Sequence, residues 1–372
     1  MIRRNERCLF LRRRFVPRVV FHGVLAGSLA VGVDLHAHSF DCITTAADFQ
    51  TALDQAGDGG IYSGEDSYIQ LAAAIYTTGS GPFHYTSTAP TGLLGIIGGA
   101  IASCFGYTDD PTLVMLDGHH TTQVLNIRSN NYVFLRLMTI QNGVSTTAGG
   151  GLAVNQGNAG GEVQISDNII RNNHTTTNGG GIAAYTSYAY FNLPELYVTA
   201  NIIYGNSADG NYGAALLQGD NTITEVLNNT VYGNTTTALG GAGGLAWAGV
   251  SGSGRIYDNI FWNNTSYGLY LVGNGAIVDY NDYDAIGGNA PGASSTGNLT
   301  LITPQFVNAG TGNFRLAGKS PLLGIGLAYC GAGEDIDGIP FPASGKADLG
   351  AYSDTVFVDG VDGDAPVCPP NP

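Results

Sequence analysis

Paired carboxylates are the first residues in this sequence that could do chemistry. An inverting glycosidase needs two of them on one exposed face, about 6.5 to 9.5 Å apart, one as general acid and one as general base. Asp282 and Asp284 form such a pair, and we take them as candidates for catalysis. The other available pairs are Asp258 with Asp279 and Asp109 with Asp110, the last of which precedes a proline in a predicted turn.

A polysaccharide lyase would instead use a basic side chain, which removes the proton next to a uronate carboxylate. Arg171, three residues before His174, is the best candidate for that base. The alternative is that Arg171 is a solvated residue at a strand end. Basic residues are scarce between Phe40 and position 303, where the sequence holds only Arg128, Arg136, Arg171 and Arg255.

Two groups of residues have spacings that invite a metal. Asp335 and Asp337 are spaced like the oxygen ligands of a Ca²⁺ loop, but the remaining ligands and the terminal Glu are missing. We therefore expect no firm cofactor and at most weak structural Ca²⁺ binding. His119 and His120 are adjacent, and neighbouring strand residues point to opposite faces, so a polar turn is the preferred interpretation.

Aromatic residues supply the remaining candidates for binding. Tyr204, Tyr232 and Trp262 occupy the same place in three successive repeats, and Tyr267 lies nearby. If that place points outward, the rings form a stripe suited to sugar rings or to another protein. If it points inward, the rings belong to the core, so both interpretations stay open.

A repeat must position all of these residues. Short segments that couple a β-branched or aromatic strand to an Asn or Gly corner recur every 28 to 33 residues. A fixed period of this size is typical of solenoids, whose units bury their apolar faces only against neighbouring units. The segments are Met138–Gly143, Asn168–Asn173, Asn201–Asn206, Asn229–Asn234, Asn259–Asn264 and the weaker Asn281–Asp284.

A second, glycine-rich element follows each of these segments, as in Gly149–Val154 and Gly179–Ala184. Two repeated strands per turn, always in the same order, stack most naturally in parallel. The sequence therefore predicts an all-β, right-handed parallel β-helix with a short N-terminal capping helix. That helix is expected over Ala46–Ala56, with a Thr N-cap, an acidic N3 residue and Phe49 among its apolar positions.

Stacked turns would place equivalent asparagines above one another, where their amides could form hydrogen-bonded ladders. Residues such as Ile169, Ile202, Thr230 and Ile260 are expected to point inward and form an apolar column. The two predicted ladders are Asn168, Asn201, Asn229 and Asn259, and Asn173, Asn206, Asn234 and Asn264.

The N-terminus has the features of a secretory signal. Residues 1–18 are rich in Arg, Val19–Val33 is an apolar run too short for a preferred membrane span, and Ala37–Ser39 offers a cleavage site. Removing residues 1–39 leaves seven basic against 27 acidic residues, a net charge of −20, which argues against nucleic-acid binding. We expect no transmembrane span in the mature chain.

Four cysteines remain once the signal is removed, and an even number in an exported chain indicates disulfides with three possible pairings. Pairs Cys42 with Cys104 and Cys330 with Cys368 would tie the two ends of the solenoid; buried free thiols are the alternative. The expected organisation is a signal peptide (1–39), cap and opening coils (40–111), regular coils (112–286), a C-terminal closing module (287–352) and a loosely ordered tail (353–372).

Five C-terminal motifs carry a resemblance to a known family. Together they resemble the closing module of secreted bacterial right-handed β-helix proteins, often called the choice-of-anchor Q domain, and the match covers roughly residues 42–352. The glycine-rich element is also similar to the repeats of polymorphic outer-membrane proteins. The resemblance implies export to the cell envelope or beyond, and implies no reaction. The motifs are Pro304–Asn308, Gly312–Leu316, Lys319–Pro321, Asp335–Gly338 and Asp348–Tyr352.

From these observations we expect a secreted or envelope protein, non-catalytic, that contacts a glycan or a cell surface. The alternative is an enzyme, a lyase or glycosidase, that degrades an acidic polysaccharide.

Overall fold

The computed structural model describes residues 37–157, 161–187, 195–220, 222–249, 253–273, 275–289, 294–327, 333–342 and 345–353. The predicted signal up to residue 36, the tail from 354 and the predicted pair Cys330 and Cys368 lie outside the described residues.

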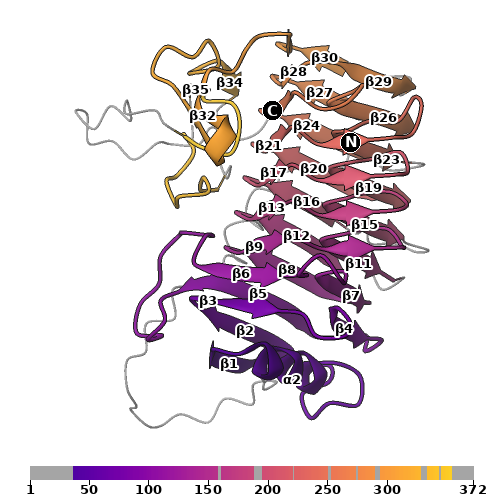
Figure 1. Cartoon of the computed structure of the whole chain (residues 1–372), viewed down its shortest axis with the longest axis vertical. Helices are drawn as coiled ribbons and strands as arrows, with labels where there is room; N and C mark the ends of the chain where they lie inside the picture. Colours follow the sequence, from indigo (N-terminus) through magenta and orange to yellow (C-terminus); the bar gives the residue numbers. More distant parts are fainter. Residues whose placement is uncertain are drawn as a thin grey trace, which may run out of the picture.

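The protein is an all-β parallel β-helix, as predicted, in which three long parallel sheets run along the molecule (Figure 1). Sheet A contains β1 (Ala37–Ile43), β2 (Asp66–Ala72), β5 (Leu93–Ala100), β8 (Tyr132–Arg136), β12 (Glu162–Ser166), β16 (Glu195–Thr199), β20 (Ile223–Leu227), β24 (Ser253–Tyr257), β27 (Ala276–Asp279) and β30 (Ser294–Thr296). Sheet B contains β3 (Ala74–Thr77), β6 (Val114–Asp117), β9 (Thr139–Gln141), β13 (Ile169–Arg171), β17 (Ile202–Tyr204), β21 (Thr230–Tyr232), β25 (Ile260–Trp262), β28 (Asp282–Tyr283) and β31 (Leu299–Thr300).

Sheet C contains β4 (Phe83–Ser87), β7 (Leu125–Ser129), β11 (Leu152–Gln156), β15 (Ile182–Ser187), β19 (Ala215–Asp220), β23 (Leu245–Gly249), β26 (Leu269–Gly273) and β29 (Ile286–Asn289). A short fourth sheet lies between B and C and contains β10 (Val144–Ser145), β14 (His174–Thr175), β18 (Ser207–Ala208) and β22 (Thr235–Thr236). Each regular coil thus passes through sheets A, B and C in turn, so the two repeated strands seen in the sequence are joined by a third.

The coil is longer than the sequence indicated. Strands β30 and β31 extend sheets A and B, so the winding continues to Thr300 rather than ending at 286. The residues between 286 and 300 lack the repeated pattern, so the sequence does not indicate that they belong to the coil.

Residues with positive φ form two corners of each regular coil, one between sheets A and B and one directly after the sheet B strand. At the corner after sheet B, φ lies between 55° and 64° at Asn142, Asn172, Gly205, Gly233 and Asn263. This is the left-handed region that Gly and Asn tolerate best, as the repeat predicted.

The asparagine ladders are present in the structure. In the first, the side-chain amide of Asn201 donates to Oδ1 of Asn229 at 3.1 Å and to the carbonyl of Ile165 at 2.8 Å. In the second, Asn206 donates to Oδ1 of Asn234 at 3.0 Å. Asn281 and Asn298 continue the first ladder, while Asp284 accepts from the backbone of Asn264 and ends the second.

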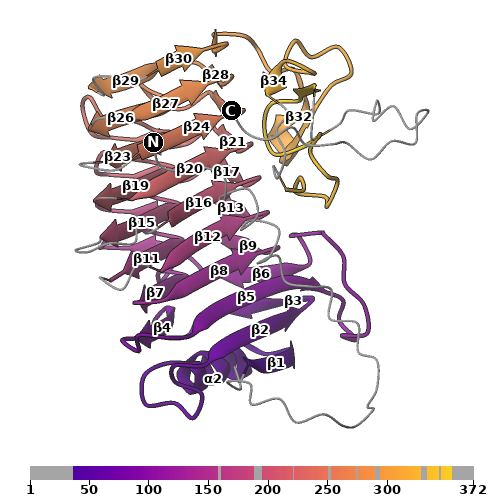
Figure 2. The ribbon, with the colours of Figure 1, turned by 180° about the vertical axis from the view of Figure 1, so that it is seen from behind.

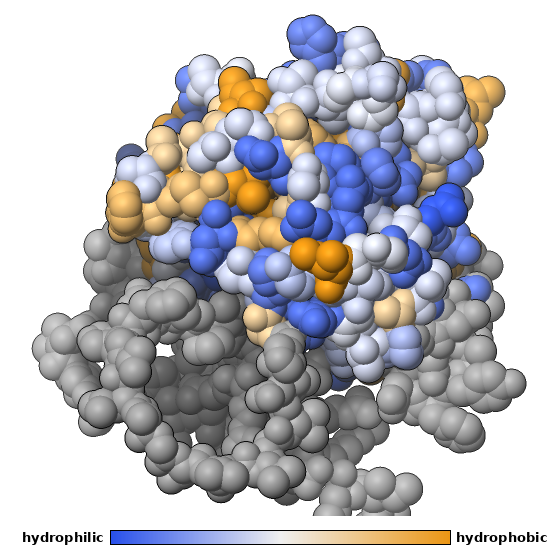
Figure 3. Space-filling view, turned by 90° about the horizontal axis from the view of Figure 1, so that it is seen from below, coloured by the Kyte–Doolittle hydropathy of each residue, from blue (hydrophilic) through white to orange (hydrophobic). Residues whose placement is uncertain are grey.

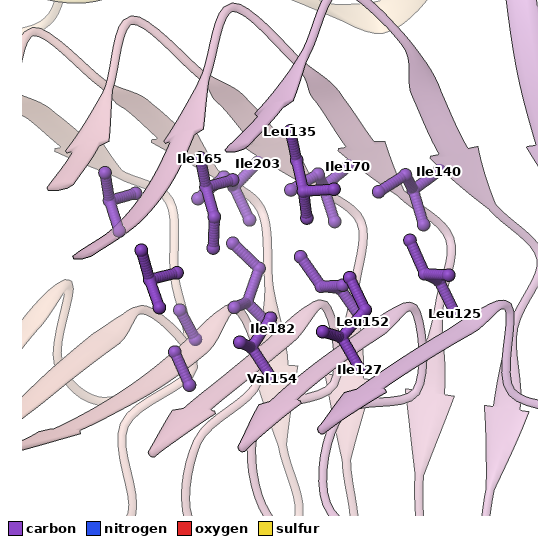
Figure 4. Packing of buried hydrophobic residues seen from close by; sticks show 14 of the residues in the cluster. Leu125, Ile127, Leu135, Ile140, Leu152, Val154, Ile165, Ile170, Ile182 and Ile203 are labelled. Atoms are coloured by element: carbon purple, nitrogen blue, oxygen red, sulfur yellow. The ribbon is translucent and has the colours of Figure 1, made fainter. Parts of the chain in front are cut away.

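The ladders also correct the expected core. Because each ladder asparagine points inward, strand alternation turns the next residue outward. Ile170, Ile203, Val231 and Phe261 therefore fill the interior, where the labelled side chains of sheets A, B and C meet (Figure 4). The residues predicted to point inward, Ile169, Ile202, Thr230 and Ile260, lie on the outer face of sheet B.

Glycines of the second element allow successive turns to approach closely. A Cβ at Gly180 would lie 2.3 Å from the carbonyl oxygen of Ser207, and one at Gly150 would lie 2.3 Å from that of His174. A side chain at either position would overlap the backbone of the neighbouring turn.

Helix α2 (Ala46–Ala56) closes the N-terminal end of the core, as predicted. Thr45 caps it by accepting from the backbone N–H of Asp48, and Phe49 and Leu53 are fully buried. The surface at this end is mixed, with apolar patches separated by polar side chains (Figure 3). The predicted disulfide between Cys42 and Cys104 is present, with a Cα–Cα distance of 5.5 Å. The predicted cleavage site, Ala37–Ser39, forms the start of β1.

The closing module, defined here as the described residues between 304 and 353, lies against one side of the upper coils (Figure 2). It contains two antiparallel strand pairs. The first is β32 (Phe306–Asn308) with β33 (Asn313–Leu316), which are joined by η1 (Ala309–Thr311), and the second is β34 (Gly326–Leu327) with β35 (Lys346–Ala347). Its apolar residues cover the outer face of sheet B.

Candidate functional site

The predicted aromatic stripe points outward but is covered. Tyr204 and Tyr232 contact Phe314 of the closing module, with ring centroids 5.0 and 5.1 Å apart, and Trp262 packs against a second apolar cluster of the module. The stripe is therefore neither part of the main core nor an open binding surface. Sequence reasoning missed this because the covering residues come from a segment far along the chain.

Arg171 and His174 do not meet in a catalytic arrangement. Both sit in polar chains that join neighbouring coils: Arg171 donates to Gln141 Oε1 at 2.9 Å and to the hydroxyl of Tyr204 at 2.9 Å. The Nδ1 atom of His174 lies 3.0 Å from Ser207 Oγ. These hydrogen bonds link neighbouring strands, those of Arg171 in sheet B and that of His174 in the short sheet.

Asp282 and Asp284 also serve the scaffold. Asp282 is the register partner of Ile260 on the outer face of sheet B. It is fully buried and has no hydrogen-bond partner at either carboxylate oxygen. Burial raises the pKa of Asp282 to about 7. The nearby backbone of Ile302 lowers this pKa by a smaller amount, although its geometry is not that of a hydrogen bond. With Asp284 ending a ladder, this pair offers no open acid and base.

A second buried carboxylate, Asp258, lies between the coil and the closing module. Its Oδ1 accepts from the backbone N–H of Leu327 at 2.8 Å, while Oδ2 is buried without a partner. Burial raises the pKa of Asp258 to about 7. Asp258, one of the carboxylates that the sequence offers for glycosidase chemistry, thus lies under the closing module rather than on an exposed face.

The suggested Ca²⁺ ligands are engaged elsewhere. Asp335 is fully buried and accepts backbone N–H groups from Asp337, Ile339 and Ser353, while Asp337 pairs with Arg315. No group of three or more potential ligands occurs among the residues that the structure describes. His119 and His120 lie in a turn at φ 51° and 55°, which agrees with the polar-turn interpretation.

The outer face of sheet A carries an acidic cluster that the sequence analysis did not single out. Glu162 and Glu195 are register partners on neighbouring strands, and the Tyr197 hydroxyl donates to Glu195 at 2.7 Å. Glu225 pairs with Arg255 at 3.0 Å, and burial raises the pKa of Glu225. These residues lie on the sheet A strands, whose sequence does not repeat from coil to coil, so no periodic pattern in the sequence indicates them.

The outer face of sheet C carries a patch of partly exposed tyrosines, Tyr212, Tyr267 and Tyr270, which we call the tyrosine patch. Ring centroids are 6.0 Å apart between Tyr212 and Tyr270 and 5.6 Å apart between Tyr267 and Tyr270. A Cβ at Gly287 would lie within 2.9 Å of two of these rings, so the glycine leaves the room that they occupy. The patch includes Tyr267, which the sequence had placed beside the stripe.

Further along sheet C, Arg128, Asn155, Gln156 and Gly157 line a shallow hollow of about 390 Å³. It lies on the same sheet as the tyrosine patch, several coils nearer the N-terminus.

The fold and these surfaces define the chain as a parallel β-helix with two distinct outer faces, one acidic on sheet A and one aromatic and polar on sheet C. Among the described residues, no helix is long and apolar enough to cross a membrane. Comparisons with protein-family models, with curated proteins and with solved structures found no match to this chain.

Proposed function

We propose that this protein is an exported, non-catalytic β-helix protein that contacts glycans through the outer face of sheet C. The observation that carries the proposal is the tyrosine patch, three clustered and partly exposed rings on a rigid scaffold. Aromatic rings with an apolar face and a hydroxyl suit the mixed apolar and polar surface of a sugar. The disulfide supports export, because such bonds persist in oxidising compartments.

The other candidate surfaces support this choice. The stripe of Tyr204, Tyr232 and Trp262 is occupied by the closing module, and the residues first considered for catalysis are bound within the scaffold. The tyrosine patch on sheet C keeps partly exposed rings that a ligand can reach.

A glycan array probed with the purified chain tests the proposal, followed by titration of the oligosaccharide that binds best. We expect Tyr212→Ala combined with Tyr270→Ala to weaken binding by tenfold or more, because each stacked ring contributes about 0.5 to 1.5 kcal/mol beyond area burial. Tyr257→Ala, an outward and partly exposed tyrosine on sheet A, is the matched control and should bind as the unmodified chain does. Equal binding by the double variant would remove sheet C from the proposal.

One observation favours a second function, hydrolysis of a polysaccharide at sheet A. A carboxyl group with a raised pKa, Glu225, lies on the same face as Glu195 and its hydrogen-bonded Tyr197, which are residue types suited to general acid and base catalysis. Release of reducing ends from a polysaccharide panel, abolished by Glu195→Gln or Glu225→Gln, would support it. Activity that both variants retain would exclude this face.

A further inference from the structure

Arg128 differs from the other arginines of the coils. Arg136 pairs with Asp167 at 2.6 Å and with Glu334 at 3.1 Å, Arg255 pairs with Glu225, and Arg171 is bound by Gln141 and Tyr204. Arg128 is exposed and makes no ion pair or hydrogen bond with the described residues. It is thus the coil arginine whose charge is not used by the fold.

The hollow beside Arg128 offers one further outward side chain, Asn155, which is exposed and is the register partner of Arg128. Gln156, the next residue, also borders the hollow, but strand alternation turns its side chain to the inner face, where its amide nitrogen donates to the carbonyl of Asn131 at 3.3 Å. A ligand at this hollow can therefore reach the side chains of Arg128 and Asn155.

Further hydrogen-bonding groups continue from Arg128 along the sheet. Arg128, Asn155, Tyr185 and Gln218 are register partners on β7, β11, β15 and β19, so they form one outward row with a rung spacing of about 4.8 Å. Its register partners on β23 and β26 are Ala248 and Val272, so the row passes beside the tyrosine patch, whose Tyr270 lies two residues earlier on β26. An extended ligand lying across the rungs can contact both.

The electrostatics of the two faces also differ. The outward residues of β7, β11 and β15 include no carboxylate and β19 carries exposed Asp220, whereas the outward positions of sheet A hold Glu162, Glu195 and Glu225. The carboxylate of Asp58, beyond the neighbouring strand β4, accepts hydrogen bonds from the backbone N–H and the hydroxyl of Thr88. Because salt screens charges beyond about 8 Å, the net negative charge of the chain need not repel an anion at this row.

We infer that the hollow at Arg128 is an anion-binding subsite of the sheet C face, and that the glycan bound there carries an acidic group, a uronate carboxylate. The inference rests on the proposed glycan contact and adds the chemical class of the ligand. A planar guanidinium binds a carboxylate through two parallel hydrogen bonds, and exposed Asn155 supplies a polar partner for a neighbouring hydroxyl.

The experiment compares a hexauronate, its carboxyl-reduced neutral counterpart and a sulfated oligosaccharide of equal length, each titrated into the full chain by calorimetry. We expect the hexauronate to bind at least tenfold more tightly than the neutral chain. Arg128→Gln should abolish that difference, and Arg128→Lys should restore it in part. Lys319→Gln removes an exposed positive charge from the closing module and is the control.

The outcomes separate the two proposals. Two results together support both proposals. The Tyr212 and Tyr270 double variant loses neutral binding, and the preference for the acidic chain is lost in Arg128→Gln but kept in Lys319→Gln. Equal affinity for acidic and neutral chains, or an acidic preference that Arg128→Gln retains, overturns the subsite and leaves the glycan contact standing. Tighter binding of the sulfated chain than of the hexauronate overturns the assignment to a carboxylate. Absence of binding to any of the three, together with a blank glycan array, overturns both.

Discussion

The backbone N–H of Ala351 donates a hydrogen bond of 3.1 Å to Oγ1 of Thr230, which lies 121 residues earlier in the chain. Next to it, Gly350 donates to the carbonyl of Asp258 at 2.8 Å, and a Cβ at this glycine would lie 2.7 Å from Thr230 Oγ1. The motif Asp348–Tyr352 is thus built to dock on sheet B. Its residue types follow from close contact between the module and the coil.

Docking of the closing module should depend on Phe314, which is 1% exposed and lies between the rings of Tyr204 and Tyr232. Phe314→Ala should cost about 3 to 5 kcal/mol at this interface, since it removes a buried aromatic ring. We expect rapid trypsin cleavage within the module, at Arg315 and Lys319, while circular dichroism shows intact coils. Val307→Ala, on the same hairpin but 55% exposed, should resist cleavage as the unmodified chain does.

Cleavage of the Phe314 variant at the unmodified rate would show that this ring does not hold the module.

Stability should decrease as pH rises from 4 to 8. Burial raises the pKa of both Asp258 and Asp282 to about 7, so the folded state binds more protons than the unfolded state above pH 4. The stability that these neutral carboxyls contribute is fully present below their unfolded pKa and is lost as pH rises through 7. Thermal midpoints measured across this range should fall, and Asp258→Asn with Asp282→Asn should flatten the profile.

Asp54→Asn, at a largely exposed side chain on α2, serves as the control and should keep the slope. A double variant with the full slope would show that other groups control the pH dependence.

The ladders should be more sensitive than their small side chains suggest. Asn229 donates to Asn259 Oδ1 at 2.9 Å and to the carbonyl of Val198 at 2.7 Å, and it accepts from Asn201. Asn229→Ala leaves several buried groups unpaired, each costing about 1 to 3 kcal/mol, so the urea midpoint should fall sharply. Asn211→Ala, at an exposed position, should leave it unchanged. Equal midpoints for the two variants would contradict a stabilising ladder.

The disulfide should stabilise the N-terminal coils. It closes a loop with a sequence separation of 62, for which chain entropy predicts about 4 kcal/mol. Replacing Cys42 and Cys104 by Ser, or adding a reductant, should lower the unfolding midpoint to a similar extent. If reductant shifts the unmodified chain but not the double variant, the effect belongs to this bond; if it shifts neither, the bond contributes nothing.

The features that could be predicted from sequence are those that repeat or act locally. The ladder asparagines, the corners at Asn142 and Gly205, and the Thr45 cap each follow from a pattern within one or two coils. The predicted orientation of the sheet B side chains was wrong, because a three-residue strand such as Ile169–Arg171 has too few residues to show alternation.

The site was harder to predict for two reasons. Tyr204 is covered by Phe314, a contact between residues 110 positions apart that no local pattern encodes. The row from Arg128 to Gln218 uses residue types that differ on every rung, so it becomes visible only when the register is known.

The shared register of the coils has a genetic consequence. The coils that carry Asn168, Asn201, Asn229 and Asn259 each bring one strand to each long sheet and one asparagine to each ladder, so a whole coil of this kind could be duplicated or deleted without changing the corners on either side. The closing module, however, is hydrogen-bonded to two particular residues of the coil, Thr230 and Asp258. Length can therefore vary by gene duplication on the N-terminal side of these two residues, whereas a coil inserted between Thr230 and Asp258 would pull the module's two anchor points apart.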